Sequence, residues 1–377
     1  MNIYAHITGW GTSVPEKVLT NDDLAEMVDT NDEWIQSRTG IRERHIVSEE
    51  QSTATLASEA AVQALAQARV SPGDVDLIIV STSYPEHIFP ATASIVQDNI
   101  GAIKAGAFDL SAACTGFILA LNMAAQAIRT GSIETAIVIG AETLSRIIDW
   151  TDRSTCILFG DGAGAFVLQA SEEPGGVLSS VMRSDGSGAD LLGLPAGGSK
   201  LPASELTVQQ GKHFLFMKGN EVFRFATRVM ASATKDVVAK AGLSLEEVDW
   251  VIPHQANRRI IETAARRLKL PIEQFVINLD RYGNTSTASV PLATVDAVQD
   301  GKLKPGDQIV FVGFGAGLTW GALAVQWTGP LPEVEERLKV WPYRLPGLYR
   351  FYARLRSILL RWVRFWEGLI WGRPPRQ

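Results

Sequence analysis

Cys114 stands in a stretch whose residue types suit nucleophilic chemistry, Ala107-Phe-Asp-Leu-Ser-Ala-Ala-Cys-Thr-Gly-Phe117. A short apolar run predicts a strand, a loop of small residues follows, and an apolar helix is expected to begin at Cys114 or just after it. The unpaired N–H groups and the macrodipole at a helix N-terminus stabilise a thiolate, the nucleophilic form of cysteine. The alternative is that Cys114 is a small buried apolar residue, as most free cysteines are.

His254 lies where a second predicted strand ends, in Val251-Ile-Pro-His-Gln-Ala-Asn257, and a helix is expected to begin near Asn257. Ligands of open parallel sheets gather outside the carboxyl ends of the strands. A lone histidine there is usually packed and hydrogen-bonded, but a cysteine predicted at the same edge favours catalysis. The glycine-rich segment 313–317 ends another strand, and glycine lets the backbone approach a ligand closely.

Two stretches of the chain repeat one another. Residues 68–76 align without gaps on 241–249, an offset of 173, and Gly131 matches Gly301 at an offset of 170. We interpret this as an internal duplication. The offset of 170 carries Cys114 onto Asn284, so two helix N-termini are expected to face each other across one pocket. Asn284 is then either a helix N-cap or an amide donor to a substrate carbonyl.

Apolar runs followed by helical patterns predict an α/β fold with parallel sheets covered on both faces. We divide the chain into a half at 1–172 that holds the cysteine, a half at 173–330 that holds the histidine and asparagine, and a tail at 331–377. The predicted strands cover residues 2–10, 76–83, 105–110, 135–141 and 156–169, and the predicted helices include 51–69 and 116–129.

Composition indicates a globular protein of 377 residues, 46% hydrophobic and 20% charged. Its two cysteines are 42 positions apart, which matches neither a metal site nor a disulfide framework, and no signal peptide is evident. We therefore expect a cytoplasmic location, no metal and no nucleic-acid partner. The net charge of −6 divides unevenly, because residues 331–377 hold ten Lys/Arg and four Glu, which leaves −12 on residues 1–330.

Several longer motifs give the sequence a resemblance to a known family over residues 2–328. They are Asp32-Glu-Trp-Ile35 with Arg38-Thr-Gly-Ile-Arg42, Ala112-Ala-Cys114, Gly160-Asp-Gly-Ala-Gly164, Pro253-His-Gln-Ala-Asn257 and Gly283-Asn-Thr-Ser286. In these the chain resembles the β-ketoacyl-acyl-carrier-protein synthase III family, the initiating condensing enzymes of type II fatty acid synthesis. The resemblance implies a thiolase fold of two duplicated βαβαβαββ-type halves in α-β-α-β-α layers, and a homodimer.

The resemblance also implies a reaction in two halves, without metal or redox cofactor. Cys114 takes a short acyl group from acyl-CoA, and the oxyanion is held by the N–H groups of Cys114 and Ala316. His254 and Asn284 then stabilise the enolate formed when malonyl-acyl-carrier protein loses CO₂. That enolate attacks the acyl-cysteine to give β-ketoacyl-acyl-carrier protein.

Further positions take their roles from the resemblance alone. Arg258 and Arg259 form a basic patch for the acidic carrier protein, and Phe89 and Phe314 shape the acyl pocket, with Phe89 placed at a dimer interface. Each of these arginines could equally be a solvated surface charge. The residues assigned to CoA are Thr30, Trp34, Arg38, Arg153, Gly219, Phe223 and Asn257.

Two features depart from the family pattern. Ala316 stands where the family usually has glycine, and residues 331–377 extend beyond its usual end. On a helix, one face of 348–371 would carry Leu, Tyr, Val, Trp and Ile, and the opposite face would carry Arg350, Arg354, Arg361 and Arg364. Such a basic amphipathic helix either lies in a membrane interface or packs on protein.

Two functional alternatives remain open on the sequence, and a third is disfavoured. One is a related condensing enzyme for longer or unusual acyl chains, since acyl-chain preference is not readable from these motifs. A degradative thiolase would need a second cysteine near 313–317, whereas Cys156 falls in a predicted strand. The last is a non-enzymatic acyl- or nucleotide-binding module held at a membrane by the tail.

Overall fold

Two sheets form the centre of the protein in the computed structural model, which describes residues 2–330 and 346–370. The first sheet has the strand order β1 (Tyr4–Ser13), β7 (Gly162–Ser171), β6 (Thr135–Glu142), β4 (Leu77–Ser81) and β5 (Gly106–Leu110). The second has the order β11 (Trp250–Pro253), β12 (Gln308–Gly315), β13 (Thr319–Gln326) and β8 (Gly176–Ser184).

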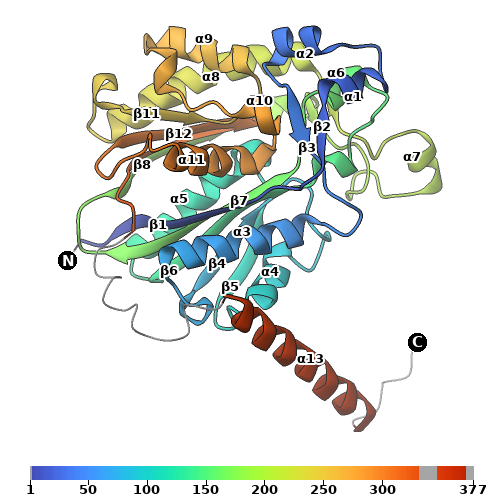
Figure 1. The fold of residues 1–377 in the computed structure, drawn as a ribbon, viewed down its shortest axis with the longest axis vertical. Helices are drawn as coiled ribbons and strands as arrows, with labels where there is room; N and C mark the ends of the chain where they lie inside the picture. The colour runs from blue at the N-terminus through green and yellow to red at the C-terminus, as the bar shows by residue number, and fades with distance from the viewer. Residues whose placement is uncertain (1, 331–345, 371–377) are drawn as a thin grey trace.

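Helices form three layers around and between these sheets (Figure 1). α3 (Thr53–Ala68) and α4 (Thr92–Ile100) cover the outer face of the first sheet. α5 (Gly116–Arg129) and α11 (Ser289–Gln299) lie between the sheets, and α8 (Gly219–Lys240) and α9 (Arg258–Leu268) cover the second. This α-β-α-β-α arrangement confirms the predicted thiolase fold.

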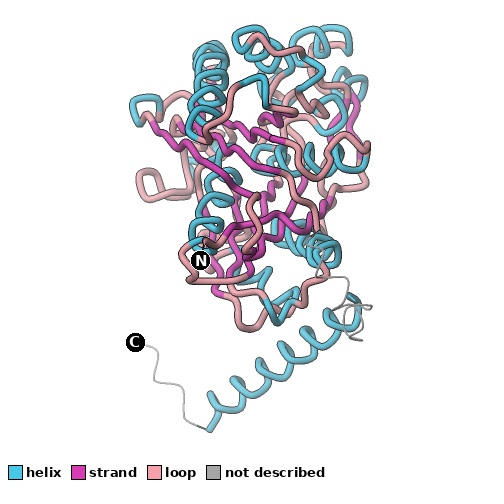
Figure 2. The backbone as a smooth tube through the Cα atoms, turned by 90° about the vertical axis from the view of Figure 1, so that its left-hand side faces the viewer, coloured by secondary structure: helices cyan, strands magenta, loops and turns pink. Residues whose placement is uncertain are grey.

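Shorter elements connect the layers and surround the pocket described below. They are β2 (Val18–Thr20), α1 (Asn21–Ala25), α2 (Asp32–Thr39), β3 (Glu43–His45), α6 (Arg153–Cys156), β9 (Leu192–Gly193), α7 (Glu205–Gln209), β10 (Phe216–Met217) and α10 (Leu279–Tyr282). α13 (Pro346–Ile370) leaves the body beside α4 and runs away from it, as both views show (Figures 1 and 2).

Close packing between layers depends on small residues at the contacts. Every residue of β6 is buried, and a Cβ on its Gly140 would collide with the carbonyl oxygen of Thr287, just before α11. β1 approaches α3 in the same way, because a Cβ on Gly9 would collide with the carbonyl oxygen of Ala64. Glycine at these positions lets β1 and β6 touch neighbouring backbone directly.

The structure corrects two expectations about the strands. Both sheets are mixed. In the first, β4 pairs in parallel with β5 and β6, while β7 is antiparallel to β1 and β6. In the second, β11 is parallel to β12, while β13 is antiparallel to β12 and β8. No full crossover helix separates β6 from β7, and a parallel pairing would need one. The predicted strand 156–169 begins only at Gly162, because Asp152 accepts a hydrogen bond from Ser154 N–H at 2.9 Å and caps α6, which ends at Cys156.

Strand membership changes from the first sheet to the second between Ser171 and Gly176, close to the proposed boundary at 172. The assignment of two duplicated domains stays a prediction. Within the described residues, no helix has the length and low charge needed to cross a bilayer.

Candidate active site

Cys114 lies on a 3-10 turn, Ala113–Thr115, between β5 and α5. The turn begins at Ala113, whose φ of 47° is in the left-handed region that non-glycine residues rarely adopt. Gly315, at the end of β12, lies directly against this turn, since a Cβ there would be 2.7 Å from the Cys114 nitrogen. Cys114 is 9% exposed and has no disulfide partner.

A second turn of the same shape faces the first one. Ser286 opens the 3-10 turn Ser286–Ala288 before α11 and has a φ of 48°. Ala113 and Ser286 have the same left-handed conformation at the start of their turns, and their positions in the sequence are 173 residues apart. With this offset Cys114 corresponds to Thr287. The offset of 170 that placed Asn284 opposite Cys114 was therefore wrong at this point. Asn284 lies three residues earlier, yet it lines the same cavity as Cys114.

His254 follows β11 and is completely buried. Its backbone N–H donates to the Val312 carbonyl at 2.8 Å, and its Nδ1 is hydrogen-bonded to Ser289 Oγ at 2.7 Å. Its ring also packs edge-on against Phe314 at 5.3 Å between centroids. Nε2 has no hydrogen-bond partner among the described residues, although it is buried. Burial lowers the pKa of His254 to about 3, so the ring is neutral at physiological pH.

Asn284 is held by both its backbone and its side chain. Its N–H donates to the Leu158 carbonyl at 2.8 Å, and its carbonyl accepts from Gly160 N–H at 3.1 Å. The side-chain oxygen Oδ1 accepts from Ser286 N–H at 2.9 Å. This contact assigns the acceptor end of the amide to the protein, which leaves the Nδ2 end as the donor available to the cavity.

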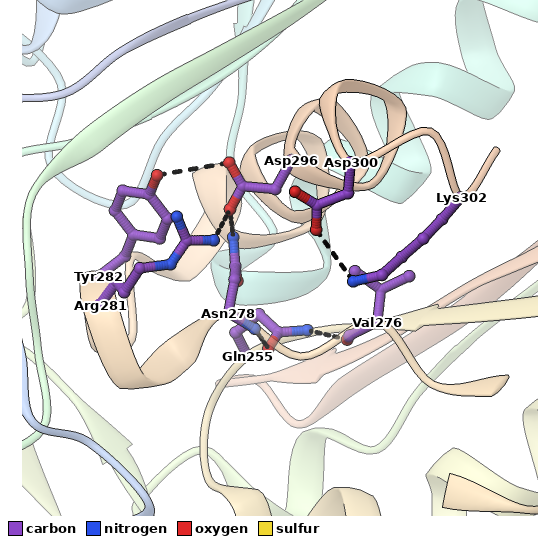
Figure 3. Close-up of polar contacts among 8 residues, drawn as sticks. All are labelled: Gln255, Val276, Asn278, Arg281, Tyr282, Asp296, Asp300 and Lys302. Atoms are coloured by element: carbon purple, nitrogen blue, oxygen red, sulfur yellow. Dashed lines mark hydrogen bonds and ion pairs between the residues drawn. The ribbon is translucent and has the colours of Figure 1, made fainter. Parts of the chain in front are cut away.

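A polar network extends from Gln255, the residue after His254, to Tyr282, which precedes Asn284 by two residues (Figure 3). Gln255 Nε2 donates to the Val276 carbonyl at 3.0 Å, and its Oε1 accepts from Asn278 N–H at 3.1 Å. Asn278 Nδ2 in turn donates to Asp296 of α11 at 2.8 Å. Asp296 also accepts hydrogen bonds from Arg281 Nη2 at 2.7 Å and from Tyr282 Oη at 3.4 Å.

Cys114 borders two cavities. The first contains all three predicted catalytic side chains and four further predicted residues, Gly219, Phe223, Asn257 and Phe314. The second lies beyond Cys114 and is mainly apolar. Its lining residues are Ser83, Ser111, Ala113, Leu144, Ile147, Phe159, Leu192, Gly193, Leu194, Leu215, Ser286 and Ala316.

The electrostatic state of the thiol differs from the expectation. Burial raises the pKa of the Cys114 thiol to about 12, against the lowering effect of a hydrogen bond from Ser286 Oγ at 3.3 Å. The buried Glu142 nearby also raises it. Burial therefore favours the protonated thiol in the free protein and opposes the stabilisation of the thiolate expected from the position of Cys114 before α5.

The predicted CoA residues at the surface fall into one cluster around Trp34. The guanidinium carbons of Arg38 and Arg153 lie 5.7 and 4.9 Å from the centroid of its ring. Arg153 also pairs with Asp29, and the hydroxyl of Thr30 is buried with no hydrogen-bond partner among the described residues. The structure thus brings Thr30, Trp34, Arg38 and Arg153 into one region.

Asn257 connects this cluster to α9. Its Nδ2 donates to the Arg38 carbonyl at 3.0 Å, and its Oδ1 caps α9 by accepting from Arg259 N–H at 2.9 Å. Arg258 pairs with Glu262 one turn along the helix, and Arg259 lies over the Phe223 ring at 5.5 Å. Both arginines are exposed, and Arg259 stands beside a residue that lines the first cavity.

The two remaining predicted site residues, Phe89 and Ala316, also lie outside the first cavity. Phe89 is 84% exposed and lines neither of the two cavities that Cys114 borders. The expected role of Phe89, which is to shape the acyl pocket from a dimer interface, stays a prediction. Ala316 lines the second cavity, in the turn after β12.

Sequence reasoning missed two serines that hold the site together. Ser286 was recognised only as part of a motif, although a hydroxyl two residues after Asn284 was the available signal. Ser289, which holds His254, had no signal in the sequence. Among residues 2–330 and 346–370, no group of His, Cys, Asp and Glu side chains is arranged to hold a metal ion.

Comparisons with known proteins identify the family. The family model described as 3-oxoacyl-[acyl-carrier-protein (ACP)] synthase III matches residues 108–186. The model described as the C terminal of that synthase matches residues 238–327. The β-ketoacyl-[acyl-carrier-protein] synthase III of Symbiobacterium thermophilum is 55% identical over 321 residues, which is 85% of this chain and 97% of that protein. That of Caldanaerobacter subterraneus is 53% identical, over 86% of this chain and 98% of its own length.

Solved structures agree. The 3-oxoacyl-[acyl-carrier-protein] synthase III of Aquifex aeolicus is 45% identical with a TM-score of 0.79, covering 86% of this chain and 100% of the other. The corresponding Thermus thermophilus enzyme is 44% identical with a TM-score of 0.80, covering 86% and 99%. With these identities over nearly the whole of each relative, the chain belongs to the β-ketoacyl-[acyl-carrier-protein] synthase III family.

Proposed function

We propose that this protein initiates fatty acid synthesis by condensing a short acyl-CoA with malonyl-acyl-carrier protein. The observation that carries the proposal is the convergence of Cys114, His254 and Asn284 on one cavity. Family membership supports the reaction class, while the role of each residue rests on its geometry and chemistry.

In the first half-reaction, the sulfur of Cys114 attacks the thioester carbon of acyl-CoA. A carbon–sulfur bond forms at Cys114, the bond to the CoA sulfur breaks, and the thiol proton ends on CoA. Because one thiol replaces another, the exchange neither consumes nor releases a proton overall, which suits a thiol that is protonated in the free enzyme. We assign the oxyanion to the backbone N–H groups of Cys114 and Ala316.

In the second half-reaction, malonyl-acyl-carrier protein loses CO₂ and its thioester becomes an enolate. We propose that His254 Nε2 and Asn284 Nδ2 donate hydrogen bonds to the enolate oxygen. Nε2 then carries the ring proton, and Nδ1 accepts from the Ser289 hydroxyl. The enolate carbon attacks the acyl carbonyl, the bond to Cys114 breaks, and the released sulfur regains a proton from solvent. The reaction as written needs no metal or redox cofactor.

The remaining site residues extend this proposal. The cluster of Trp34, Arg38 and Arg153 with Thr30 would hold the nucleotide end of CoA, and Gly219, Phe223 and Asn257 would line the pantetheine path. The exposed Arg258 and Arg259 would meet the acidic carrier protein. The apolar second cavity would take the acyl chain, with Phe314 at the junction beside His254.

We also propose that the protein acts as a cytoplasmic homodimer. β5 is an edge strand of the first sheet, since it pairs with β4 on one side and with no other described strand. The side chain of Phe108 in β5 is 38% exposed. An exposed apolar edge strand is a template for pairing with a second chain. Phe89, exposed in its own chain, would then reach the partner. Phe108→Glu is expected to shift the mass measured by light scattering from dimer to monomer, and an unchanged dimer would contradict this interface.

The function is tested by separating the two half-reactions. Incubation with acetyl-CoA is expected to add an acyl group to Cys114, detected by mass spectrometry of the peptide, and Cys114→Ala should abolish it. Asn284→Asp keeps the oxygen that accepts from Ser286 N–H but removes the donor. It should retain acylation and lose condensation by about 10²–10³-fold.

A series of acetyl-, branched short-chain and long-chain acyl-CoA substrates then compares the proposal with its nearest alternatives. Fastest acylation by long chains would indicate a condensing enzyme for other substrates. Binding of acyl-CoA without any acyl-Cys114 would indicate a binding module and would end the proposal.

A further inference from the structure

α13 is held against the body along one narrow strip. Ala353 is 8% exposed, and the Ser357 hydroxyl donates to the Asp98 carboxylate of α4 at 2.7 Å. Leu360 is half-buried. These three residues follow the four- and three-residue spacing of a single helix face. The strip therefore defines which side of α13 meets the protein.

The opposite side of α13 is a broad apolar surface with no partner among the described residues. At 100° per residue, its members cluster around the direction pointing away from the strip. Their exposures run from 44% to 65%, far above those of core residues. The members of this apolar face are Phe351, Tyr352, Leu355, Ile358, Leu359, Trp362, Val363, Phe365 and Trp366. Figures 1 and 2 show α13 projecting from the body, with only its first turns close to other elements.

The charges on α13 have one predominant sign. Arg354, Arg356, Arg361 and Arg364 are exposed, and Glu367 is the single acidic residue among 351–367. None of these arginines takes part in an ion pair with another described residue. The tail 331–377 carries +6 in total and residues 1–330 carry −12. An anionic surface would therefore attract the helix and repel the body.

We propose that α13 docks this protein on an anionic phospholipid surface, with the apolar face in the headgroup layer and the arginines on lipid phosphates. Aromatic side chains with a polar end favour the membrane–water interface, and arginine binds phosphate through its planar fork. The helix lies on the membrane and does not span it, since arginines recur along its length. A second α13 would cover the apolar face but leave the arginines without an anionic partner, whereas an anionic lipid surface takes up both.

This inference goes beyond the condensing activity, and its test does not depend on that activity. Full-length protein is sedimented with vesicles of phosphatidylglycerol and phosphatidylcholine, or of phosphatidylcholine alone. We expect binding only to the anionic vesicles, and weaker binding at about 1 M salt, where the screening length is about 3 Å. Trp362→Ser with Trp366→Ser, or Arg361→Gln with Arg364→Gln, should each weaken binding at least about tenfold.

The control variant carries Arg129→Gln with Lys302→Gln, which removes two exposed positive charges from the body, and it should bind like the unchanged protein. Acylation by acetyl-CoA should persist in every variant and reports that the fold is intact. Absence of vesicle binding would overturn the proposal, as would equal binding to both kinds of vesicle. A fall in oligomer mass for the tryptophan variant in lipid-free solution would show that a second copy covers the face instead.

Discussion

Ser286 holds two of the proposed catalytic groups at once. Its N–H donates to Asn284 Oδ1 at 2.9 Å, and its hydroxyl donates to Cys114 Sγ at 3.3 Å. The left-handed φ of 48° at Ser286 lets one residue reach both groups from the same turn. Ser286 therefore fixes the thiol relative to the amide that would receive the second substrate.

Replacing Ser286 by alanine is expected to slow reactions of the thiol. The hydroxyl lowers the pKa of Cys114, so its loss raises that pKa further and reduces the thiolate fraction at any given pH. One hydrogen bond of about 1–1.5 kcal/mol corresponds to a rate of iodoacetamide alkylation about tenfold lower. Ser179→Ala is the matched control, because its buried hydroxyl donates to the Val237 carbonyl, away from the site. Unchanged alkylation in Ser286→Ala would contradict this role.

The sequence revealed the residues that carry chemistry and missed those that position them. Cys114 and His254 were recognisable because each follows an apolar run that ends at a sheet edge. Ser289 was not, since its role depends on a 2.7 Å contact across 35 residues that only the folded chain creates. The raised pKa of Cys114 was missed for the same reason, because β12 and the turn Ser286–Ala288 pack against the turn that carries Cys114.

The end of β12 packs directly against the turn Ala113–Thr115, which carries Cys114. Gly315→Ala would place a Cβ 2.7 Å from the Cys114 nitrogen and 3.2 Å from Ala113 Cβ. We expect a loss of about 1–3 kcal/mol in unfolding free energy from overpacking, together with slower acylation by acetyl-CoA. Urea unfolding and acyl-enzyme mass spectrometry measure the two effects.

Ala316→Gly is the matched control for Gly315→Ala. It changes the adjacent residue, removes a methyl group instead of adding one, and lies in a partly exposed turn. Acylation in Ala316→Gly is expected to stay within a few-fold of the unchanged protein. If Gly315→Ala acylates equally fast, the close approach of β12 does not matter for the thiol.

α11 anchors the network behind His254 and Asn284 through Asp296. Asp296→Ala would leave the donors of Asn278, Arg281 and Tyr282 without their shared acceptor. The carboxylate is only 14% exposed, so we expect a loss of about 1–3 kcal/mol in unfolding free energy, measured by urea unfolding. Asp300→Ala breaks an exposed pair with Lys302 and should cost less than about 1 kcal/mol. Equal losses in the two variants would argue against the network.

Element prediction was successful where pattern and capping agree. The helix expected at 116–129 is α5, Gly116–Arg129, and the strand expected at 105–110 is β5, Gly106–Leu110. α6 was missed because its four residues are too few for a periodic pattern, and the cap at Asp152 decides their shape. Strand direction was not predictable from apolar runs, since buried parallel and antiparallel strands read alike.

The stability of the whole molecule at acid pH depends on its buried titratable groups, and His254 lowers the free energy of unfolding as pH falls. Its pKa is about 3 when folded and near 6.5 when unfolded, so between these values the unfolded chain binds a proton that the folded chain does not. Its contribution therefore disfavours the folded state increasingly as pH falls below about 6.5, by about 1.4 kcal/mol per pH unit. Burial raises the pKa of Glu142 and Asp161, and these carboxyls act in the opposite direction.

A comparison of two proteins isolates the histidine from those carboxyls. The unfolding free energy of the unchanged protein minus that of His254→Gln should fall steadily from pH 7 to pH 4. Urea unfolding at each pH measures this difference. Parallel stability curves over that range would mean that burial does not lower the pKa of His254 in the folded protein, which would contradict this prediction.

At the scale of the molecule, the sequence predicted the layered fold and the basic tail, but not where the tail attaches. The arginine and aromatic pattern of 348–371 allowed docking on a membrane or on protein. The choice depends on which side of the helix meets α4, and that depends on the pairing of Ser357 with Asp98, 259 residues apart in sequence.

α4 has a second attachment at its other end. The carboxylate of Asp109, in β5, accepts from Thr92 N–H at 2.7 Å and from Ala93 N–H at 2.8 Å at the start of α4. One short helix thus joins α13 to the strand that leads into Cys114, with a carboxylate at each joint. A force that pulls on α13 would therefore act on α4 through Asp98 and on β5 through Asp109, and β5 is the strand that leads into the turn carrying the Cys114 sulfur.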